Sequence, residues 1–350
     1  MSEEISGSKK FLRCGGENFG SEKFFGRGGE NFGSEKNNSP AHNRYYAAQK
    51  NFAKKFSAAY SAAKNFLARK LLFKRLKAKG EEILKVANKI IVASVQMDCA
   101  PYEKEKNLAH AEELIAEAAA RGAKLIVLPE LFSTGYRVEL KDRELSEELT
   151  GATTTRLQVL AKKFDAYIAG AILERGAGDM VFDTAILVGA QGLLGIHRKM
   201  HLWGDEVKRF QKGAALDVIK LPSATVGLLI CYEIGFPELS RIQVRKGADI
   251  LIYPSAFGKA RYYAWEIASK SRALENGAFV VACNRCGQDS DSVFGGLSRI
   301  VAPDATILAG AGVEEERVVC AEIDLDATKK MRRTLPYLRD LNQKLFNQNF

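Results

Sequence analysis

Three residues that could do chemistry follow or adjoin apolar segments of the chain. Glu130 follows the apolar run at 125–129, and Cys231 follows a second apolar run at 226–230. Lys199 lies within the segment HRKMHLWGDE. Active sites of α/β sheets lie in the crevice beyond the carboxyl ends of their strands, so we expect these three side chains to face one crevice.

Each of these residue types suits one task in covalent catalysis. A thiol between a strand and a helix N-terminus lies close to main-chain N–H groups, which favour a thiolate and can hold an oxyanion. A glutamate between apolar neighbours suits general-base catalysis. A lysine in the same crevice would stabilise an oxyanion and assist ionisation of the thiol. Singly, a core cysteine, a solvated glutamate and a surface lysine are more common, but the combination indicates a cysteine nucleophile.

The other residues with metal-binding side chains do not form a recognisable site. His197 and His201 lack further ligands and are expected to be structural. Cys283 and Cys286 form a CxxC pair without a second pair or nearby histidines. The six cysteines are scattered over 350 residues, unlike a secreted disulfide framework. We therefore expect reduced, structural cysteines apart from Cys231, and no metal site.

Alternating apolar patterns beyond Lys89 predict the elements that position these residues. The pattern is typical of one α/β domain spanning 89–350. The expected strands are 90–97, 124–128, 166–173, 182–188, 225–230, 250–253, 279–282, 298–301 and 318–323, and the expected helices are 103–121, 153–164, 237–246 and 262–276.

The N-terminal part of the chain has a different composition. The sequence GGENFGSEK occurs at 15–23 and again at 28–36. These residues have too little apolar surface to offset the entropy of ordering the backbone, so we expect 1–40 to be disordered. The segment 41–88 is rich in Ala, Lys, Phe and Leu with helical spacing, which predicts a basic amphipathic helix.

The whole formal charge of +10 belongs to this extension. Residues 1–88 hold 18 Lys and Arg against 8 Asp and Glu, whereas 89–350 hold 34 of each sign. A weak anionic partner, nucleic acid or a membrane surface, would therefore bind the extension. Two other readings stay open: a solvated helix packed on the body or on a partner, and a segment added by a misassigned start codon.

Composition also limits the class of protein. The chain is 46% hydrophobic and 27% charged, as expected for a globular protein with a sizeable core. No apolar run approaches the roughly 18 residues of a membrane span, and no basic segment followed by an apolar one opens the chain. We therefore expect no transmembrane segment and a cytoplasmic location.

The order of the three motifs resembles the nitrilase, or carbon-nitrogen hydrolase, superfamily. Glu130 matches the base in that family's LPE segment, Lys199 the lysine of its RKxHL segment, and Cys231 the cysteine of its C-Y-x-x-x-F-P-E segment. Glu206 occupies the place of a further glutamate that helps to position substrate and lysine. The similarity extends from about residue 90 to 345 and includes the RALENG segment at 272–277.

The resemblance implies a four-layer αββα sandwich, assembled as a homodimer or a larger homo-oligomer. It implies that Glu130 takes the thiol proton, that Cys231 attacks an amide, carbamoyl or nitrile carbon, and that Lys199 holds the oxyanion together with the Tyr232 N–H. A thioester is then cleaved by water without a cofactor. The residues expected to bind substrate are Glu206, Tyr136, Tyr232, Ser255 and Phe257.

The substrate is less well defined by the sequence. Several branches of the family carry an Asp and then bulky or basic residues where this chain has Glu233, Ile234 and Gly235. A nitrilase proper more often has a Trp after the cysteine, where this chain has Tyr232. We therefore expect hydrolysis of a small amide or N-carbamoyl compound with release of ammonia. A nitrilase acting on a small nitrile, or an inactive scaffold with this fold, is the alternative.

Overall fold

The computed structural model describes residues 88–342 and 344, together with positions 51, 54, 55, 70 and 74. The predicted disordered segment 1–40 lies outside the described residues, as does most of the predicted helix at 41–88. The five described positions between 51 and 74 are helical and exposed. The fold below belongs to the second of the chain's two units, Leu76–Phe350.

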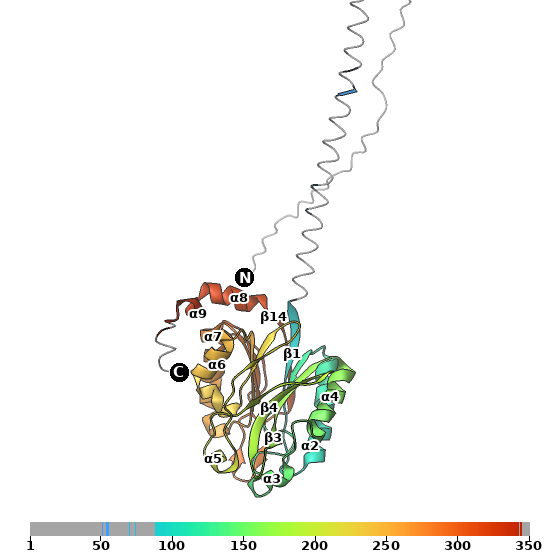
Figure 1. Cartoon of the computed structure of the whole chain (residues 1–350), viewed down its shortest axis with the longest axis vertical. Coiled ribbons are helices and arrows are strands. Elements are labelled where there is room, and N and C mark those ends of the chain that lie inside the picture. The colour runs from blue at the N-terminus through green and yellow to red at the C-terminus, as the bar shows by residue number, and fades with distance from the viewer. Residues whose placement is uncertain are drawn as a thin grey trace, which may run out of the picture. The chain divides into compact units, whose positions relative to one another are not determined.

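Two six-stranded sheets form the centre of this unit (Figure 1). The first has the order β14-β1-β2-β3-β4-β5, with β1, β2 and β3 parallel. The second has the order β13-β12-β9-β8-β7-β6, with β7, β8 and β9 parallel. Their bounds are β1 Lys89–Gln96, β2 Leu125–Val127, β3 Tyr167–Arg175, β4 Val181–Gly189, β5 Gly192–Arg198, β6 Val218–Lys220, β7 Thr225–Leu228, β8 Ile250–Ser255, β9 Phe279–Asn284, β12 Arg299–Val301, β13 Ile307–Gly310 and β14 Arg317–Asp324.

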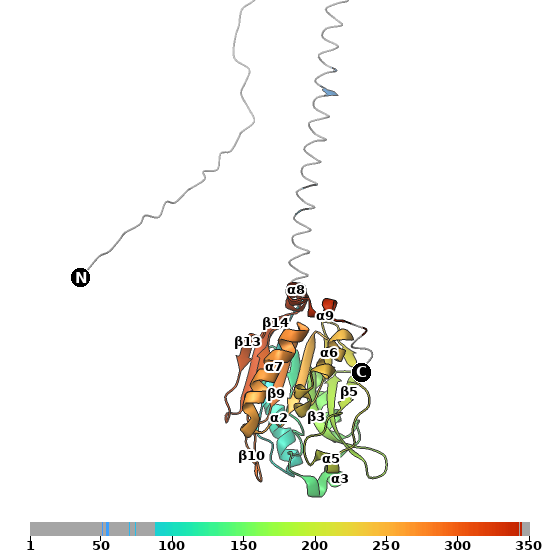
Figure 2. The same cartoon turned by 90° about the vertical axis from the view of Figure 1, so that its left-hand side faces the viewer.

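Helices cover the outer faces of both sheets, so the unit has four layers, as the resemblance implies. Figure 1 shows α2 and α4 on the side of the first sheet, and in Figure 2 α6 and α7 cover the second. The remaining short elements include the hairpin of β10 Gln288–Asp289 and β11 Ser292–Val293. The helix bounds are α2 Lys104–Ala120, α3 Asp142–Leu145, α4 Ala152–Phe164, α5 Glu206–Arg209, α6 Pro237–Arg245, α7 Tyr262–Asn276, α8 Asp326–Thr334 and α9 Tyr337–Asp340, with short 3-10 turns η1 Glu139–Lys141, η2 Cys231–Gly235 and η3 Lys259–Arg261.

Apolar side chains from both sheets meet in one core. Leu125 and Ala169 of the first sheet are buried in the same cluster as Leu228, Leu251 and Val281 of the second. A second cluster fills the space between the first sheet and its helices α2 and α4. Because both faces of the central parallel strands are buried, these strands are continuous apolar runs, which is why the sequence pattern reveals them.

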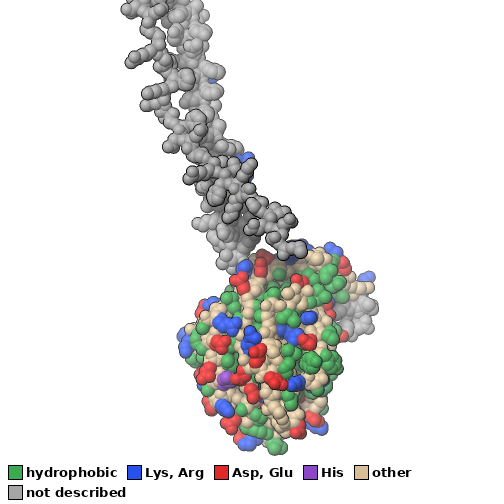
Figure 3. Space-filling model, turned by 180° about the vertical axis from the view of Figure 1, so that it is seen from behind, with side chains coloured by type: hydrophobic (Ala, Val, Ile, Leu, Met, Phe, Trp, Pro, Cys, Tyr) green, Lys and Arg blue, Asp and Glu red, His purple; other side chains and the backbone are tan. Residues whose placement is uncertain are grey.

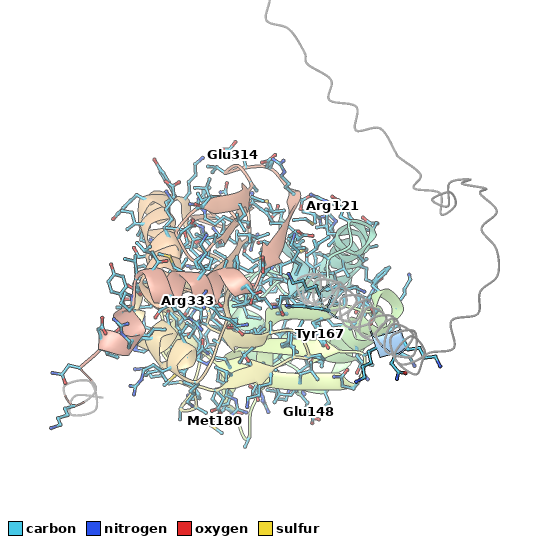
Figure 4. The ribbon with its side chains drawn as sticks, turned by 90° about the horizontal axis from the view of Figure 1, so that it is seen from above. Arg121, Glu148, Tyr167, Met180, Glu314 and Arg333 are labelled. Atoms are coloured by element: carbon cyan, nitrogen blue, oxygen red, sulfur yellow. The ribbon has the colours of Figure 1, made fainter. Side chains whose placement is uncertain are left out.

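The two ends of the sandwich differ. Figure 1 shows α3 and α5 at one end and α8 at the other, and Figure 4, seen from above, shows α8 with Arg333 lying across its end. Arg332 of α8 donates to the carbonyls of Asn276 and Ala248, which lie where α7 ends and just before β8 begins. Helix α8 thus packs on the end of the sandwich opposite α5. The polar residues described below lie at the α5 end.

Most predicted elements are present with bounds that differ by one or two residues. The predicted helix at 103–121 is α2, and the predicted strand at 318–323 is β14. Strand β5, Gly192–Arg198, was not predicted. It contains two glycines and ends in polar residues, so its local pattern is weak, and pairing with β4 decides its conformation.

The described surface has a mixed distribution of charge. Figure 3 shows Lys and Arg side chains interspersed with Asp and Glu over the face seen from behind. This mixture agrees with the equal numbers of basic and acidic residues in 89–350. Among the residues that the structure describes, no helix has the length and apolar character needed to cross a bilayer.

Candidate active site

Glu130 lies at the start of a turn three residues beyond the end of β2. Its side chain is fully buried, and the next residue, Leu131, has a left-handed backbone with φ 50°. Carboxylate atom Oε2 accepts a hydrogen bond from the Ala256 N–H at 2.7 Å, and Oε1 accepts one from the Lys199 ammonium. Both oxygens are thus held in place by donors from other elements.

Cys231 begins the η2 turn just beyond β7. Its φ is 44°, a left-handed conformation that costs an ordinary L-residue energy and is found most often at functional sites. The side chain is 6% exposed and lines a narrow cavity. The strained turn therefore points the thiol at this cavity, in the manner of a nucleophile elbow. Cys231 lies between a strand and a helix, as predicted, and the η2 turn separates it from the start of α6 at Pro237.

Lys199 directly follows β5, and its ammonium binds three carboxylates. Nζ donates to Glu130 Oε1, to Glu206 Oε1 at 2.8 Å and to Asp183 Oδ2 at 3.2 Å. All four side chains are buried, with at most 2% exposed. An ammonium has three N–H donors, so these three acceptors satisfy it. A carboxylate oxygen from each acid lies within 4.8 Å of the others, and the protein's own cation binds at the point where they converge.

Protonation of one of the three acids would reduce the excess negative charge of this cluster. Three carboxylates around one ammonium would leave two uncompensated negative charges in the interior. Burial raises the pKa of Asp183 well above its usual range, and the charges of Glu130 and Glu206 raise it further against the effect of Lys199. Burial lowers the pKa of Lys199, but the carboxylates outweigh it and raise that pKa well above its usual value. These shifts favour the neutral form of Asp183 and the charged form of Lys199.

The Cys231 thiol does not have the lowered pKa that the sequence led us to expect. Burial raises its pKa well above the usual range, the charge of Glu130 raises it further, and the charge of Lys199 lowers it by less. The charges of Glu130 and Lys199 both act on the thiol, which places it close to this cluster. The resting thiol is thus neutral, so its proton must leave at the moment of attack.

Two adjoining cavities lead to the thiol. The inner cavity, about 20 Å³, is lined by Cys231, Tyr232 and Phe257, and the outer one, about 190 Å³, by charged residues of the α5 end. Four residues line both cavities: Tyr136, Trp203, Ala256 and Arg261. The thiol therefore lies at the base of a narrow well that widens outward.

Four of the five residues predicted to bind substrate line the two cavities, and Ser255 does not. Tyr136, Tyr232 and Phe257 line the inner cavity, and Glu206 lines the outer one. Tyr136 donates from its hydroxyl to Glu206 at 2.6 Å. Ser255 is fully buried, donates to the Tyr253 carbonyl of its own strand at 3.1 Å, and lines neither cavity.

Several residues of the site were missed from the sequence. Asp183 carried a signal, since it is a lone acid in the apolar strand β4, but nothing local indicated its partner. Trp203 lies in the lysine motif and lines both cavities, and Arg261 lies far from any motif. The main-chain N–H of Ala256, which binds Glu130, could not be predicted from the residue type, because every residue except proline has such a group.

The CxxC pair is structural, as predicted. The Cys283 thiol is fully buried and lies within hydrogen-bond distance of the carbonyls of Val95 and Val127, which belong to the opposite sheet. Burial raises the pKa of Cys286 to about 12. The five described cysteines are all free thiols.

Comparison with known proteins places the site in a family. The model of the carbon-nitrogen hydrolase family matches residues 91–333. The chain is 38% identical to a nitrilase of Pyrococcus abyssi over 72% of its own length and 94% of that protein's. It is 34% identical to an omega-amidase NIT2 of Danio rerio, over 70% of this chain and 92% of that one.

Solved structures agree with this result. An amidase from Nesterenkonia sp. AN1 is similar in fold with a TM-score of 0.67 and 26% identity, over 75% of this chain and 97% of that one. The matched residues contain the buried cluster of Glu130, Lys199 and Glu206 together with Cys231. The chain therefore belongs to the carbon-nitrogen hydrolase family of the nitrilase superfamily, whose enzymes act on carbon–nitrogen bonds other than peptide bonds.

Proposed function

We propose that this protein hydrolyses a small amide or N-carbamoyl compound through a thioester on Cys231. The observation that carries the proposal is the buried ion pair of Glu130 and Lys199, whose charges both act on the buried Cys231 thiol. A base, a cation and a nucleophile are thereby brought to the base of one cavity. The small inner cavity admits only a small acyl group beside the thiol.

The first half of the reaction forms the thioester. The Cys231 sulfur attacks the carbon of the amide, and its proton passes to Glu130. The oxygen becomes an oxyanion, which the Lys199 ammonium and the N–H of Tyr232 stabilise. Collapse of this intermediate breaks the carbon–nitrogen bond, and the nitrogen leaves as ammonia with the proton from Glu130.

The second half releases the acid. Glu130 takes a proton from a water molecule, and the resulting hydroxide attacks the thioester carbon. A second oxyanion forms in the same position, and its collapse breaks the carbon–sulfur bond. The sulfur regains a proton from Glu130, which restores the resting state. Glu206 accepts hydrogen bonds from Tyr136, Lys199 and the Trp203 N–H, so we assign it the positioning of Lys199.

The relatives support amide hydrolysis. The Nesterenkonia structure is a mutant that shows covalent addition of the acetamide moiety of fluoroacetamide at the active-site cysteine. Of the relatives at least 33% identical over about 70% of this chain, several are omega-amidases. Tyr136, Tyr232 and Phe257 would contact the acyl group, and we assign buried Ser255 a structural role within β8.

Nitrile hydrolysis is the second candidate, because a relative at 38% identity is named a nitrilase. The same thiol would attack a nitrile carbon, and the two substrates differ in the bond order at the carbon attacked. An inactive scaffold is disfavoured, since a binding role alone gives no reason to keep Glu130, Lys199 and Cys231 together in one buried site.

The test is ammonia release from a panel of short amides, N-carbamoyl amino acids and nitriles, with mass spectrometry of the intact protein. We expect turnover of amides or carbamoyl compounds and a mass increase equal to the acyl group on Cys231. Cys231→Ala should fold and lose both signals, whereas Cys283→Ala keeps the nucleophile and should retain them. Turnover by Cys231→Ala would refute the thiol mechanism, and turnover of nitriles alone would favour the second candidate.

We also propose that the protein assembles as a homodimer or a larger homo-oligomer. Tyr263 and Ile267 lie one turn apart on α7 and are 61% and 65% exposed. Large apolar side chains adjacent on one helix face are typical of a surface that another molecule covers. A second copy of α7 packed against the first would bury both pairs.

A further inference from the structure

Arg285 is a fully buried cation outside the catalytic cluster, and it directly follows β9. Its guanidinium donates to Asp289 Oδ2 and to Asp98 Oδ1, each at 2.7 Å, and to the carbonyl of Cys286 at 3.2 Å. Its carbon lies 4.0 Å from the centre of the Phe294 ring. The donor edges and one flat face of the guanidinium are thus occupied, so Arg285 is fixed in place.

Asp289 connects this cation with the active site through one carboxylate oxygen. Besides the bond from Arg285, Oδ2 accepts the main-chain N–H of Tyr136 at 2.9 Å and that of Arg137 at 3.2 Å. Asp289 is 1% exposed, and in the part of the chain that the structure describes its Oδ1 has no hydrogen-bond partner. The main chain at Tyr136 is therefore held by a single buried oxygen atom.

Tyr136 extends this connection to the catalytic cluster. Its hydroxyl donates to Glu206 Oε1 at 2.6 Å, and the same oxygen accepts a bond from Lys199 at 2.8 Å. Burial and the charge of Glu206 raise the pKa of the phenol well above its usual range, so the hydroxyl keeps its proton and remains a donor. A continuous series of hydrogen bonds thus leads from Asp289 to the Lys199 ammonium.

A buried ion pair is weak evidence for a role in stability. The cost of removing two charges from water largely offsets their attraction, so an apolar pair of similar volume is often as stable. The pair of Arg285 and Asp289 offers something that an apolar pair cannot, which is an acceptor for two main-chain N–H groups beside the cavity above Cys231. Its position therefore points to a role in the geometry of the site.

We infer that Asp289 is a positioning residue for catalysis, which fixes the main chain at Tyr136 and thereby aims the phenol at Glu206. Glu206 in turn orients Lys199. This inference rests on the proposed function, because in that mechanism the lysine must reach the oxyanion. Neither Asp289 nor Arg285 lines the two cavities that lead to the thiol, so Asp289 acts through Tyr136 and not by contact with substrate.

The experiment measures acylation of Cys231 by para-nitrophenyl acetate on the full-length protein. The sulfur forms a bond to the acetyl carbon, the thiol proton passes to Glu130, and para-nitrophenolate leaves and is followed by its absorbance. This activated ester reports on the thiol and the oxyanion site whichever amide is the natural substrate. The dependence of the rate on ester concentration gives a maximal rate constant and a half-saturating concentration.

Asp289→Ala should lower the maximal rate constant about 10- to 100-fold and change the half-saturating concentration less than about threefold, because the misplaced group is the cation and not the cavity wall. Asp289→Asn removes the charge but keeps an acceptor oxygen, so it should restore the rate constant to within about threefold of wild type. Asp98→Asn is the matched control and should leave both quantities unchanged. Asp98 also binds Arg285, but the N–H groups at 136–137 donate to Asp289.

A double-mutant cycle tests whether Asp289 acts through the phenol. Tyr136→Phe removes the hydroxyl and should itself lower the maximal rate constant. In that background Asp289→Ala should lower it by less than about a further twofold, because the bond that Asp289 positions is already absent. Losses that multiply, or a loss in Asp289→Asn as large as that in Asp289→Ala, would show that Asp289 acts only through its charge on the fold and would overturn the inference.

Arg285→Met combined with Asp289→Leu covers the case in which Asp289→Ala does not fold. Replacing both partners of a buried pair by apolar residues commonly preserves stability, yet it removes the acceptor for the Tyr136 N–H, so the same fall in the maximal rate constant is expected. A wild-type rate constant in this folded variant would overturn the inference and leave the thiol mechanism standing. No acetylation of Cys231 in the wild-type protein, judged by mass spectrometry, would overturn both.

Discussion

Glu233 and His197 form a buried pair at the base of the site. Nε2 of His197 donates to Glu233 Oε2 at 2.7 Å, and both side chains are at most 2% exposed. Burial opposes ionisation of Glu233, but His197 and nearby N–H donors outweigh burial and lower its pKa to about 2. The carboxylate is therefore ionised at neutral pH, and Nε2 of His197 carries the proton.

The same carboxylate connects the two catalytic segments. It accepts hydrogen bonds at 2.8 Å from the N–H of Ile230, which precedes Cys231, and from the N–H of Met200, which follows Lys199. A fixed distance between nucleophile and cation is needed for the lysine to reach the oxyanion. Glu233 thus acts as a positioning residue, a role that its place in the sequence did not reveal.

Glu233→Gln should lower kcat while changing KM little. It should also lower the melting temperature at pH 7. The pKa of Glu233 is lowered from 4.5 to about 2 on folding, so its stabilising effect is complete above pH 4.5 and is lost as the pH falls toward 2. The difference in melting temperature between variant and wild type should shrink over the same range. Glu322→Gln, which removes an exposed partner of Lys89, is the matched control and should change stability little. A pH-independent difference would contradict the assignment.

Glu130→Gln should separate the role of the base from its effect on the thiol. Turnover should fall by a factor on the order of 10² to 10⁴, because the proton acceptor is lost. The charge of Glu130 raises the pKa of Cys231, so its removal lowers that pKa and increases the thiolate fraction. Alkylation of Cys231 by iodoacetamide, counted by mass spectrometry, should therefore be faster in the variant at pH 8. In the native protein the rate should rise with pH beyond 9 without a plateau. Slower alkylation of the variant would show that Glu130 does not raise the thiol pKa.

Asp183→Asn tests the protonation state of the cluster around Lys199. An amide closely matches a protonated carboxyl group in shape and charge, so we expect a melting temperature within about 2 °C of wild type. Glu206→Gln, by contrast, removes a carboxylate that accepts a hydrogen bond from Lys199 and should lower kcat. A loss of kcat in Asp183→Asn as large as that in Glu206→Gln would contradict a neutral Asp183.

Ile267→Asp should change the oligomeric state if α7 forms the contact between copies. A charge at the centre of an apolar interface is costly to bury, so we expect a lower mass by light scattering. Val159→Asp, at a 62% exposed apolar position on α4, is the control for the charge change. Equal mass for Ile267→Asp and wild type would exclude this face.

A protein truncated to begin at Val86 should fold and keep its kinetic constants. The cut lies outside β1, which begins at Lys89, and the residues of the active site all lie beyond it. Any binding to nucleic acid or anionic vesicles should disappear with the truncation and should weaken with salt in the full chain. If the extension instead packs on the body or on a partner copy, the truncated protein would have a lower melting temperature or mass.

The sequence by itself was sufficient for the parts of this protein that depend on local pattern. Buried parallel strands are continuous apolar runs, so the strands that end near Glu130 and Cys231 were visible, and motif order indicated the family and the αββα fold. Strand β5, which delivers Lys199, was missed, because its conformation depends on pairing with β4 rather than on its own residues.

Tertiary structure decided the electrostatics of the site. The sequence led us to expect a thiol of lowered pKa, but burial and the charge of Glu130 raise it, and both effects depend on residues about 100 positions apart. Asp183 and Arg261 were not predicted as site residues for the same reason. The burial of a charged group and the identity of its neighbours depend on distances in space, which the spacing of residues along the chain does not give.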